Sequence, residues 1–146
     1  MQKVPAYGFT LLEIIIVISL IGLISTFFLG NVFSSLARGR DSRRKQDLRS
    51  VAQGLELYYN DNRAYPTALP TPGQAFSHPQ DTNVIYLSKI PADPVSAQNY
   101  CYSSSTGTSY KFYANLENLK DLDIIPTITC SGKNYNYGIS SPNTTP

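Results

Sequence analysis

A long run of residues without a charged side chain, from Ile14 to Ala37, constrains this sequence most. About two dozen such positions are enough to cross the hydrocarbon core of a bilayer as one helix. A single carboxylate, Glu13, stands directly before the run. Because a charge buried in an apolar environment is costly unless it finds a partner, we expect Glu13 to meet a cation wherever the run is buried.

The segment before the run does not have the order of an ordinary secretory signal. Met1 to Gly8 is short and polar, and Lys3 is its only charged residue. Secretory signals place the small residue of the cleavage site after the apolar stretch, whereas Gly8 precedes it here. Cleavage after Gly8 would leave the apolar run on the mature chain. The alternative is an uncleaved signal anchor.

The stretch Gly8-Phe9-Thr10-Leu11-Leu12-Glu13, followed by Ile14 to Ile18, resembles the class III signal of type IV pilins and type II secretion pseudopilins. The resemblance implies that a prepilin peptidase removes residues 1–8 and that the new terminal residue, Phe9, is N-methylated. It also implies that Glu13 acts in filament assembly. In that reading Glu13 approaches the amine at Phe9 of a neighbouring subunit. Such a buried pair contributes little net stability but fixes register, because breaking it strands a charge.

The helical pattern continues beyond the apolar run. Apolar residues recur every three or four positions from Leu48 to Tyr59, which predicts an amphipathic helix that ends near Asn60–Asn62. The sequence therefore predicts one long helix with an apolar half, residues 9–37, and an amphipathic half, residues 38–62. We also expect it to bend or melt locally near Gly22 or Gly30 when packed in a filament.

A basic cluster begins the amphipathic half and contains Arg38, Arg40, Arg43, Arg44, Lys45 and Arg49. By the positive-inside rule this cluster would keep the C-terminal domain in the cytoplasm, whereas the cysteines and the pilin resemblance favour an extracytoplasmic domain. The cluster could pair with carboxylates of neighbouring subunits such as Asp41, Asp47 or Glu56. It could also contact anionic lipid or DNA. The simplest interpretation is a solvated helix face with weak local ion pairs.

Residues 63–146 predict a small domain with short strands. A loop rich in proline and glycine, residues 67–83, should contain no regular element of any length, and Val84–Leu87 is a helical turn or an edge strand. The strand candidates are Tyr100–Tyr102, Tyr110–Asn115 and Asn134–Tyr137. The expected fold class is therefore α+β, with the long helix packed on a small antiparallel sheet, and the resemblance implies that this arrangement is pilin-like.

The only two cysteines, Cys101 and Cys130, lie in this domain. Beyond a membrane segment, in a domain rich in Ser, Thr, Asn and Tyr, they predict one disulfide in an oxidising compartment. The alternative is two free thiols in a cytosolic domain. A disulfide that closes a loop of about thirty residues would contribute roughly 3 kcal/mol to stability on the loop-entropy model.

No catalytic constellation or nucleotide-binding motif is present in the sequence, and we expect no enzyme and no cofactor. Calcium is the one metal to weigh, because the pseudopilin resemblance implies it. Asp121 and Asp123, with nearby Glu117, are weak candidates, since calcium needs six or more oxygen ligands. A solvated loop is the alternative.

The resemblance implies a structural subunit that is stored in the inner membrane and polymerises through its N-terminal helix. The C-terminal domain would be extracytoplasmic, and the product would be a cell-surface pilus or the periplasmic pseudopilus of a type II secretion system. The alternative is a membrane-anchored binding domain that never polymerises. Expected partners are identical or related subunits, the prepilin peptidase, an assembly platform with its ATPase and membrane lipid, with DNA as a further candidate.

Overall fold

One helix spans the first half of the chain. The computed structural model describes residues 8–146, and for residues 27–31 it describes the backbone alone. Helix α1, Leu11–Asn62, runs without interruption through Gly22 and Gly30. The bend predicted at these glycines applies to the helix packed in a filament, so it stays a prediction. The chain divides into two compact units, one ending at Leu36 and one spanning Ala37–Pro146. The predicted leader, residues 1–8, lies outside the described residues except for Gly8.

The end of α1 is set by backbone geometry. Arg63 has a left-handed conformation (φ 58°) and donates its backbone N–H to the carbonyl of Tyr59 at 2.8 Å. A left-handed residue after the last helical position is a common helix C-terminus, because it satisfies a carbonyl of the final turn. The predicted end of the helix at Asn60–Asn62 is confirmed.

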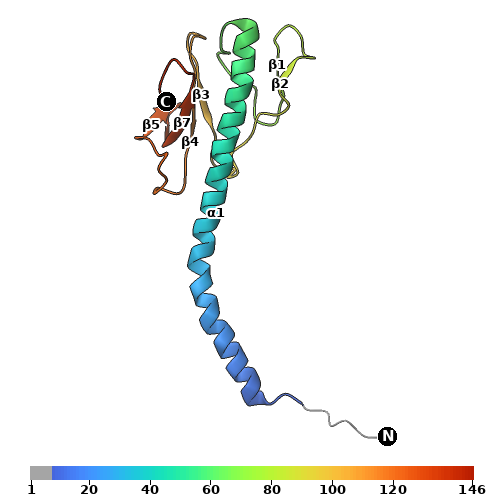
Figure 1. The fold of residues 1–146 in the computed structure, drawn as a ribbon, viewed down its shortest axis with the longest axis vertical. Helices are drawn as coiled ribbons and strands as arrows, with labels where there is room; N and C mark the ends of the chain where they lie inside the picture. Colours follow the sequence, from blue (N-terminus) through green and yellow to red (C-terminus); the bar gives the residue numbers. More distant parts are fainter. Residues whose placement is uncertain (1–7) are drawn as a thin grey trace, which may run out of the picture. The chain divides into compact units, whose positions relative to one another are not determined.

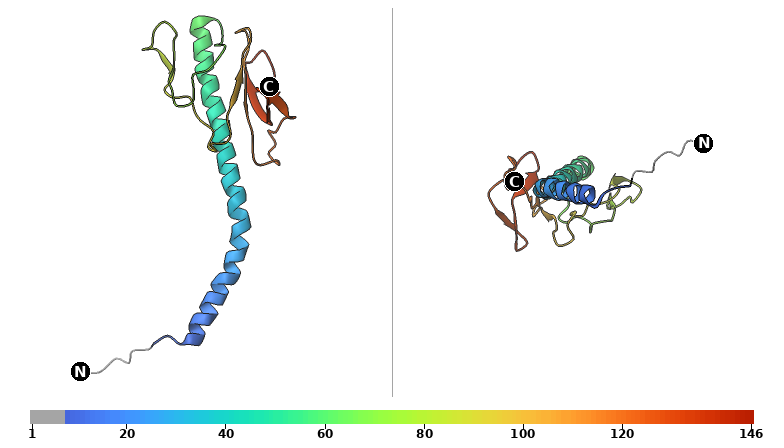
Figure 2. Two further views of the ribbon diagram at one scale, coloured as in Figure 1. Left: turned by 180° about the vertical axis from the view of Figure 1, so that it is seen from behind. Right: turned by 90° about the horizontal axis from the view of Figure 1, so that it is seen from below.

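The second unit contains seven short strands in three antiparallel sheets (Figure 1). β3 (Cys101–Ser103), β4 (Lys111–Ala114) and β7 (Tyr137–Ser140) form a three-stranded sheet in the order β3-β4-β7. Hairpins are formed by β1 (Phe76–Ser77) with β2 (Ile85–Leu87), and by β5 (Ile128–Cys130) with β6 (Lys133–Tyr135). Within this unit, the two views of Figures 1 and 2 place the β1–β2 hairpin and the three-stranded sheet on opposite sides of α1. The expected α+β class, a helix packed on small antiparallel sheet, is confirmed.

The core of this unit forms along one stripe of α1. Leu48, Val51 and Leu55 are fully buried, as their spacing of three and four residues predicts. They pack with side chains from the loops and the sheets, which are Tyr65, Phe76, Ile90, Tyr110, Phe112, Ala114, Leu116 and Tyr137. Gly54 lies on the same stripe, where an added Cβ would be 3.5 Å from the carbonyl oxygen of Tyr86.

The prediction that residues 67–83 contain no regular element was wrong at β1. Phe76 is buried and stacks on Tyr58 at 5.2 Å between ring centroids. This burial holds the short strand against β2, so Val84–Leu87 contributes a strand rather than a helical turn. The prolines of the loop lie outside the two residues of β1, where they remove no ladder hydrogen bond.

The third predicted strand, Asn134–Tyr137, was also wrong, because it joins parts of two strands. Asn136 leaves the ladder, since its side-chain oxygen accepts the backbone N–H of Leu116 at 2.6 Å and its amide donates to the carbonyl of Leu116 at 3.0 Å. β6 therefore ends at Tyr135 and pairs with β5, whereas β7 begins at Tyr137 and pairs with β4.

Candidate functional site

The N-terminal motif lies at the start of α1. Thr10 caps the helix, because its Oγ1 accepts the backbone N–H of Glu13 at 3.2 Å. Glu13 therefore occupies the first turn, where the helix dipole favours a negative charge. Gly8 and Phe9 precede the helix and are exposed. The structure thus places the predicted cleavage junction just outside the helix.

The described apolar side chains of the first unit are exposed. From Ile14 to Ile24 the large apolar residues are each 46–62% exposed, and Phe9 is 82% exposed. Glu13 is exposed as well and makes no ion pair with any other described residue. Among the described residues the structure has no helix that is both long and apolar enough to cross a bilayer. An apolar surface of this extent indicates a site of association.

Half of the basic cluster is not a solvated face, because it binds carboxylates of the C-terminal half of the chain. Arg44 is completely buried. Its Nε and Nη2 donate to the two carboxylate oxygens of Asp93 at 2.8 and 2.9 Å. Its Nη1 donates to Asp41 at 2.8 Å and to Glu117 at 2.7 Å. Burial lowers the pKa of Arg44, but these hydrogen bonds raise it overall.

The carboxylates around Arg44 also fix the loop of residues 117–125. Asp41 accepts the backbone N–H groups of Glu117 and Asn118 at 2.9 and 2.8 Å. Arg40 donates from Nε and Nη2 to the carboxylate of Glu117, in a bidentate pair. This hydrogen bonding from Arg40, helped by Arg44, lowers the pKa of Glu117 from 4.5 to about 2.

The weak calcium candidates are brought together, and Lys45 lies between them. Its Nζ donates to Asp121 Oδ1 at 2.6 Å and to Asp123 Oδ2 at 2.7 Å. Burial lowers the pKa of Lys45 but the two hydrogen bonds raise it overall, and the bond from Lys45 lowers the pKa of Asp121. Among the described residues, no group of three or more His, Cys, Asp or Glu side chains could hold a metal ion.

Two further carboxylates in the second half of α1 also have partners within the chain. Asp47 accepts the hydroxyl of Tyr100 at 2.7 Å, and Glu56 accepts that of Tyr65 at 3.1 Å. These bonds, together with burial, raise the pKa of Tyr100, and they raise that of Tyr65 to about 12. In the described chain Arg38, Arg43 and Arg49 are exposed and form no ion pair. These three arginines are the part of the cluster still available to lipid, nucleic acid or another subunit.

Sequence reasoning missed the partners of Arg44. The signal was the helical spacing itself, because Asp41 and Arg44 continue the buried stripe of Leu48, Val51 and Leu55 at intervals of three and four residues. A charged pair on the extension of an apolar stripe requires partners from whatever covers that stripe. Asp93 and Glu117, in the loops that follow, supply them.

The structure contains the predicted disulfide between Cys101 and Cys130, with a Cα–Cα distance of 6.2 Å. It joins β3 to the end of β5 and packs in a small second core with Tyr113 and Tyr135. Ser131 and Gly132 follow with left-handed conformations (φ 49° and 75°) and close the β5–β6 hairpin. Such a two-residue turn needs positive φ at both positions.

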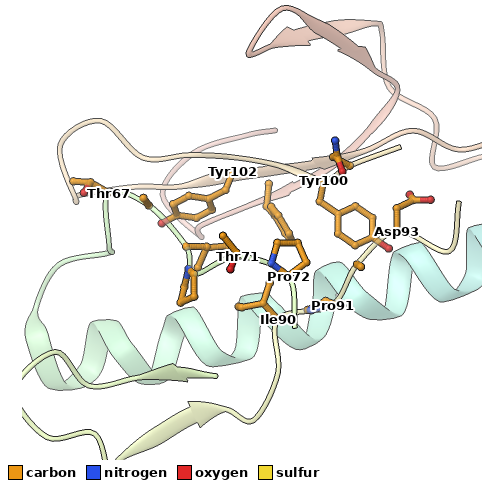
Figure 3. A pocket seen from close by; sticks show the side chains of 14 residues that line it. Thr67, Thr71, Pro72, Ile90, Pro91, Asp93, Tyr100 and Tyr102 are labelled. Atoms are coloured by element: carbon orange, nitrogen blue, oxygen red, sulfur yellow. The ribbon is translucent and has the colours of Figure 1, made fainter. Parts of the chain in front are cut away.

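A cleft of about 400 Å³ lies between the proline-rich loop and β3 (Figure 3). The rings of Tyr100 and Tyr102 face Pro72 and Ile90 across it. Three of its polar side chains are already engaged, because Tyr102 donates to the carbonyl of Pro66 at 2.7 Å, Tyr100 to Asp47, and Asp93 binds Arg44. A ligand site needs a few polar groups that can orient the ligand, so the cleft is a weak binding candidate.

Comparison with known families places the chain beside proteins of bacterial secretion. The family described as type II secretion system (T2SS), protein G, matches residues 31–115. This match begins after the Gly8–Glu13 motif, so the motif and the match are separate observations. No solved structure matches the chain.

Curated relatives carry the same description. The type II secretion system core protein G of Pseudomonas aeruginosa is 32% identical over 101 residues, which are 64% of this chain and 71% of that protein. The proteins of that name from Klebsiella michiganensis (31% identical; 64% of this chain, 71% of that protein) and Dickeya chrysanthemi (29% identical; 62% and 64%) are similar.

Proposed function

Because the chain belongs to the family of type II secretion system protein G, we propose that it is a structural subunit of a secretion pseudopilus. In this proposal copies of the chain polymerise through the apolar half of α1. The observation that carries it is the exposure of apolar side chains all round the helix from Ile14 to Ile24. A helix that is apolar on every side needs apolar surroundings on every side.

The subunit is stored in the inner membrane before assembly, with its second unit on the periplasmic side. The uncharged run from Ile14 to Ala37 supports this step. The disulfide supports an oxidising compartment for the second unit. A prepilin peptidase cleaves after Gly8, and Phe9 becomes the methylated N-terminus. In the filament the helix then exchanges lipid for neighbouring helices.

Glu13 selects the register of assembly. It is exposed and lacks a cation within the described chain, while Phe9 lies four positions before it in the sequence and is also exposed. In a staggered array the carboxylate of one subunit can approach the N-terminal amine of the next. Breaking such a pair in an apolar core is strongly unfavourable, since it leaves a buried charge. The assembly platform and its ATPase provide the work of extraction.

The experiment compares wild-type chain, Glu13→Val and Glu13→Asp in cells that lack the chromosomal copy. Filaments are isolated from the periplasm after the outer membrane is opened and are quantified, and secretion of a type II substrate is assayed in the same cultures. We expect wild-type chain to form filaments, Glu13→Val to stay in the membrane fraction, and Glu13→Asp to retain part of both activities. Mass spectrometry should find methylated Phe9 as the mature N-terminus. Normal filaments from Glu13→Val would refute the role of Glu13, and absence of wild-type chain from filaments would refute the subunit role.

A further inference from the structure

The 117–125 loop carries the side chains that the pseudopilin resemblance links to calcium, and each of them is already bonded to a basic side chain of α1. Both carboxylate oxygens of Glu117 are engaged, Oε1 by Arg40 and Arg44 and Oε2 by Arg40. The guanidinium groups stand where a metal would have to approach. Glu117 is therefore a partner of two arginines and not a free ligand.

The two remaining carboxylates enclose an ammonium group. Lys45 Nζ lies 2.6 Å from Asp121 Oδ1 and 2.7 Å from Asp123 Oδ2, and it stands 5.5 Å from the centroid of the Tyr137 ring. Two carboxylates and an aromatic face are favourable surroundings for a lysine cation. Asp121 Oδ1 also accepts the backbone N–H of Asp123 at 3.0 Å, which fixes the turn that presents both carboxylates.

A calcium ion does not fit beside this lysine. Calcium takes six to eight oxygen ligands and depends on carboxylates for charge, whereas Asp121 and Asp123 already share the ammonium group of Lys45. The ammonium group is a donor without lone pairs, and it would repel a divalent ion placed within a few ångströms. Lys45, Asp121 and Asp123 therefore form a salt bridge and not a calcium site.

We propose that Lys45 takes the place of a divalent cation in this chain, fastening the 117–125 loop to α1 through Asp121 and Asp123. The start of the loop is held separately, by the backbone bonds of Glu117 and Asn118 to Asp41. Lys45 supplies the second attachment, which neutralises two neighbouring carboxylates that would otherwise repel each other. The stability of the second unit is consequently independent of calcium.

Thermal unfolding of the full chain in detergent tests this proposal. Near-UV circular dichroism of the tyrosines reports the second unit, in excess EGTA or excess calcium chloride. We expect the wild-type Tm to be the same in both. Lys45→Met should lower Tm by about 4 °C, the shift expected for the loss of one modest interaction in a domain of this size, and by the same amount in both solutions. Lys120→Met is the matched control, because Lys120 is an exposed lysine of the same loop without an ion pair in the described chain.

A wild-type Tm that falls in EGTA and recovers with calcium would overturn the proposal, and so would calorimetric binding of calcium to the wild-type chain. A Lys45→Met variant that melts like Lys120→Met would also overturn it. If Lys45→Met does not fold, Asp123→Asn removes the negative charge of one of the two acceptors at a half-exposed position and should give a smaller shift that calcium does not change. These unfolding measurements are independent of filament assembly, so either proposal can fail alone.

Discussion

The two halves of α1 differ in which of their side chains are buried. In the first half Ile16 is 50% exposed and its apolar neighbours are similarly uncovered, whereas in the second half Arg44, a cation, is completely buried. Arg44 can be buried because Asp41, Asp93 and Glu117 surround it. The buried charges of the second half have partners within the chain, whereas the described apolar side chains of the first half are exposed. This contrast locates the surface at which other molecules are needed, because extended apolar exposure is rare without a function.

The largest expected effect comes from breaking the buried ion network. Arg44→Met keeps much of the side-chain volume but leaves Asp41 and Asp93 buried without their cation. Removing one partner of a buried pair costs about 3–5 kcal/mol, so we expect a loss of that size in the free energy of unfolding, measured by urea denaturation. Arg43→Met, one position earlier and exposed, should change it by less than about 0.5 kcal/mol. Equal effects of the two variants would show that Arg44 is not the centre of the network.

A second comparison probes the apolar residues of the two halves. Leu55 is fully buried and Ile18 is 59% exposed. Leu55→Ala should destabilise the second unit by about 2–5 kcal/mol, through lost burial and a cavity. Ile18→Ala should leave the tyrosine-detected unfolding unchanged and instead reduce the yield of filaments. Destabilisation of the second unit by Ile18→Ala would show that the halves do not act separately.

Local patterns in the sequence predict the long helix and its buried stripe, but not all of the tertiary contacts that its side chains make. The spacing of Leu48, Val51 and Leu55 is sufficient to predict the buried stripe, because helix periodicity is a property of neighbouring residues. The contact of Arg44 with Asp93 joins residues 49 positions apart. That pairing depends on how the loops cross the helix, which periodicity does not specify.

Asn136 illustrates the same limit within a strand. Tyr135 and Tyr137 alternate as in one strand, and the prediction joined them. The side chain of Asn136 instead bonds the backbone of Leu116, 20 positions away, and divides the segment between two sheets. A single tertiary hydrogen-bond partner therefore overrides an alternating pattern.

The smallest of the expected effects appears only as a pH dependence. The folded chain holds the pKa of Glu117 at about 2, below its ordinary value of 4.5. The ionised carboxylate therefore stabilises the folded chain at pH values above the pKa that Glu117 has in the unfolded chain. This stabilisation is lost as the pH falls through the pKa that Glu117 has in the folded chain. Its carboxylate is 25% exposed, so we expect a contribution of about 1–2 kcal/mol once solvent screening is allowed for. The wild-type free energy of unfolding should therefore fall between about pH 5 and pH 2. Glu117→Gln should remove that part of the slope. Asp81→Asn should not, because Asp81 is exposed and its carboxylate bonds Asn83 instead of an arginine. Urea denaturation at a series of pH values measures both slopes, and identical profiles for wild type and Glu117→Gln would show that the arginines do not depend on this carboxylate.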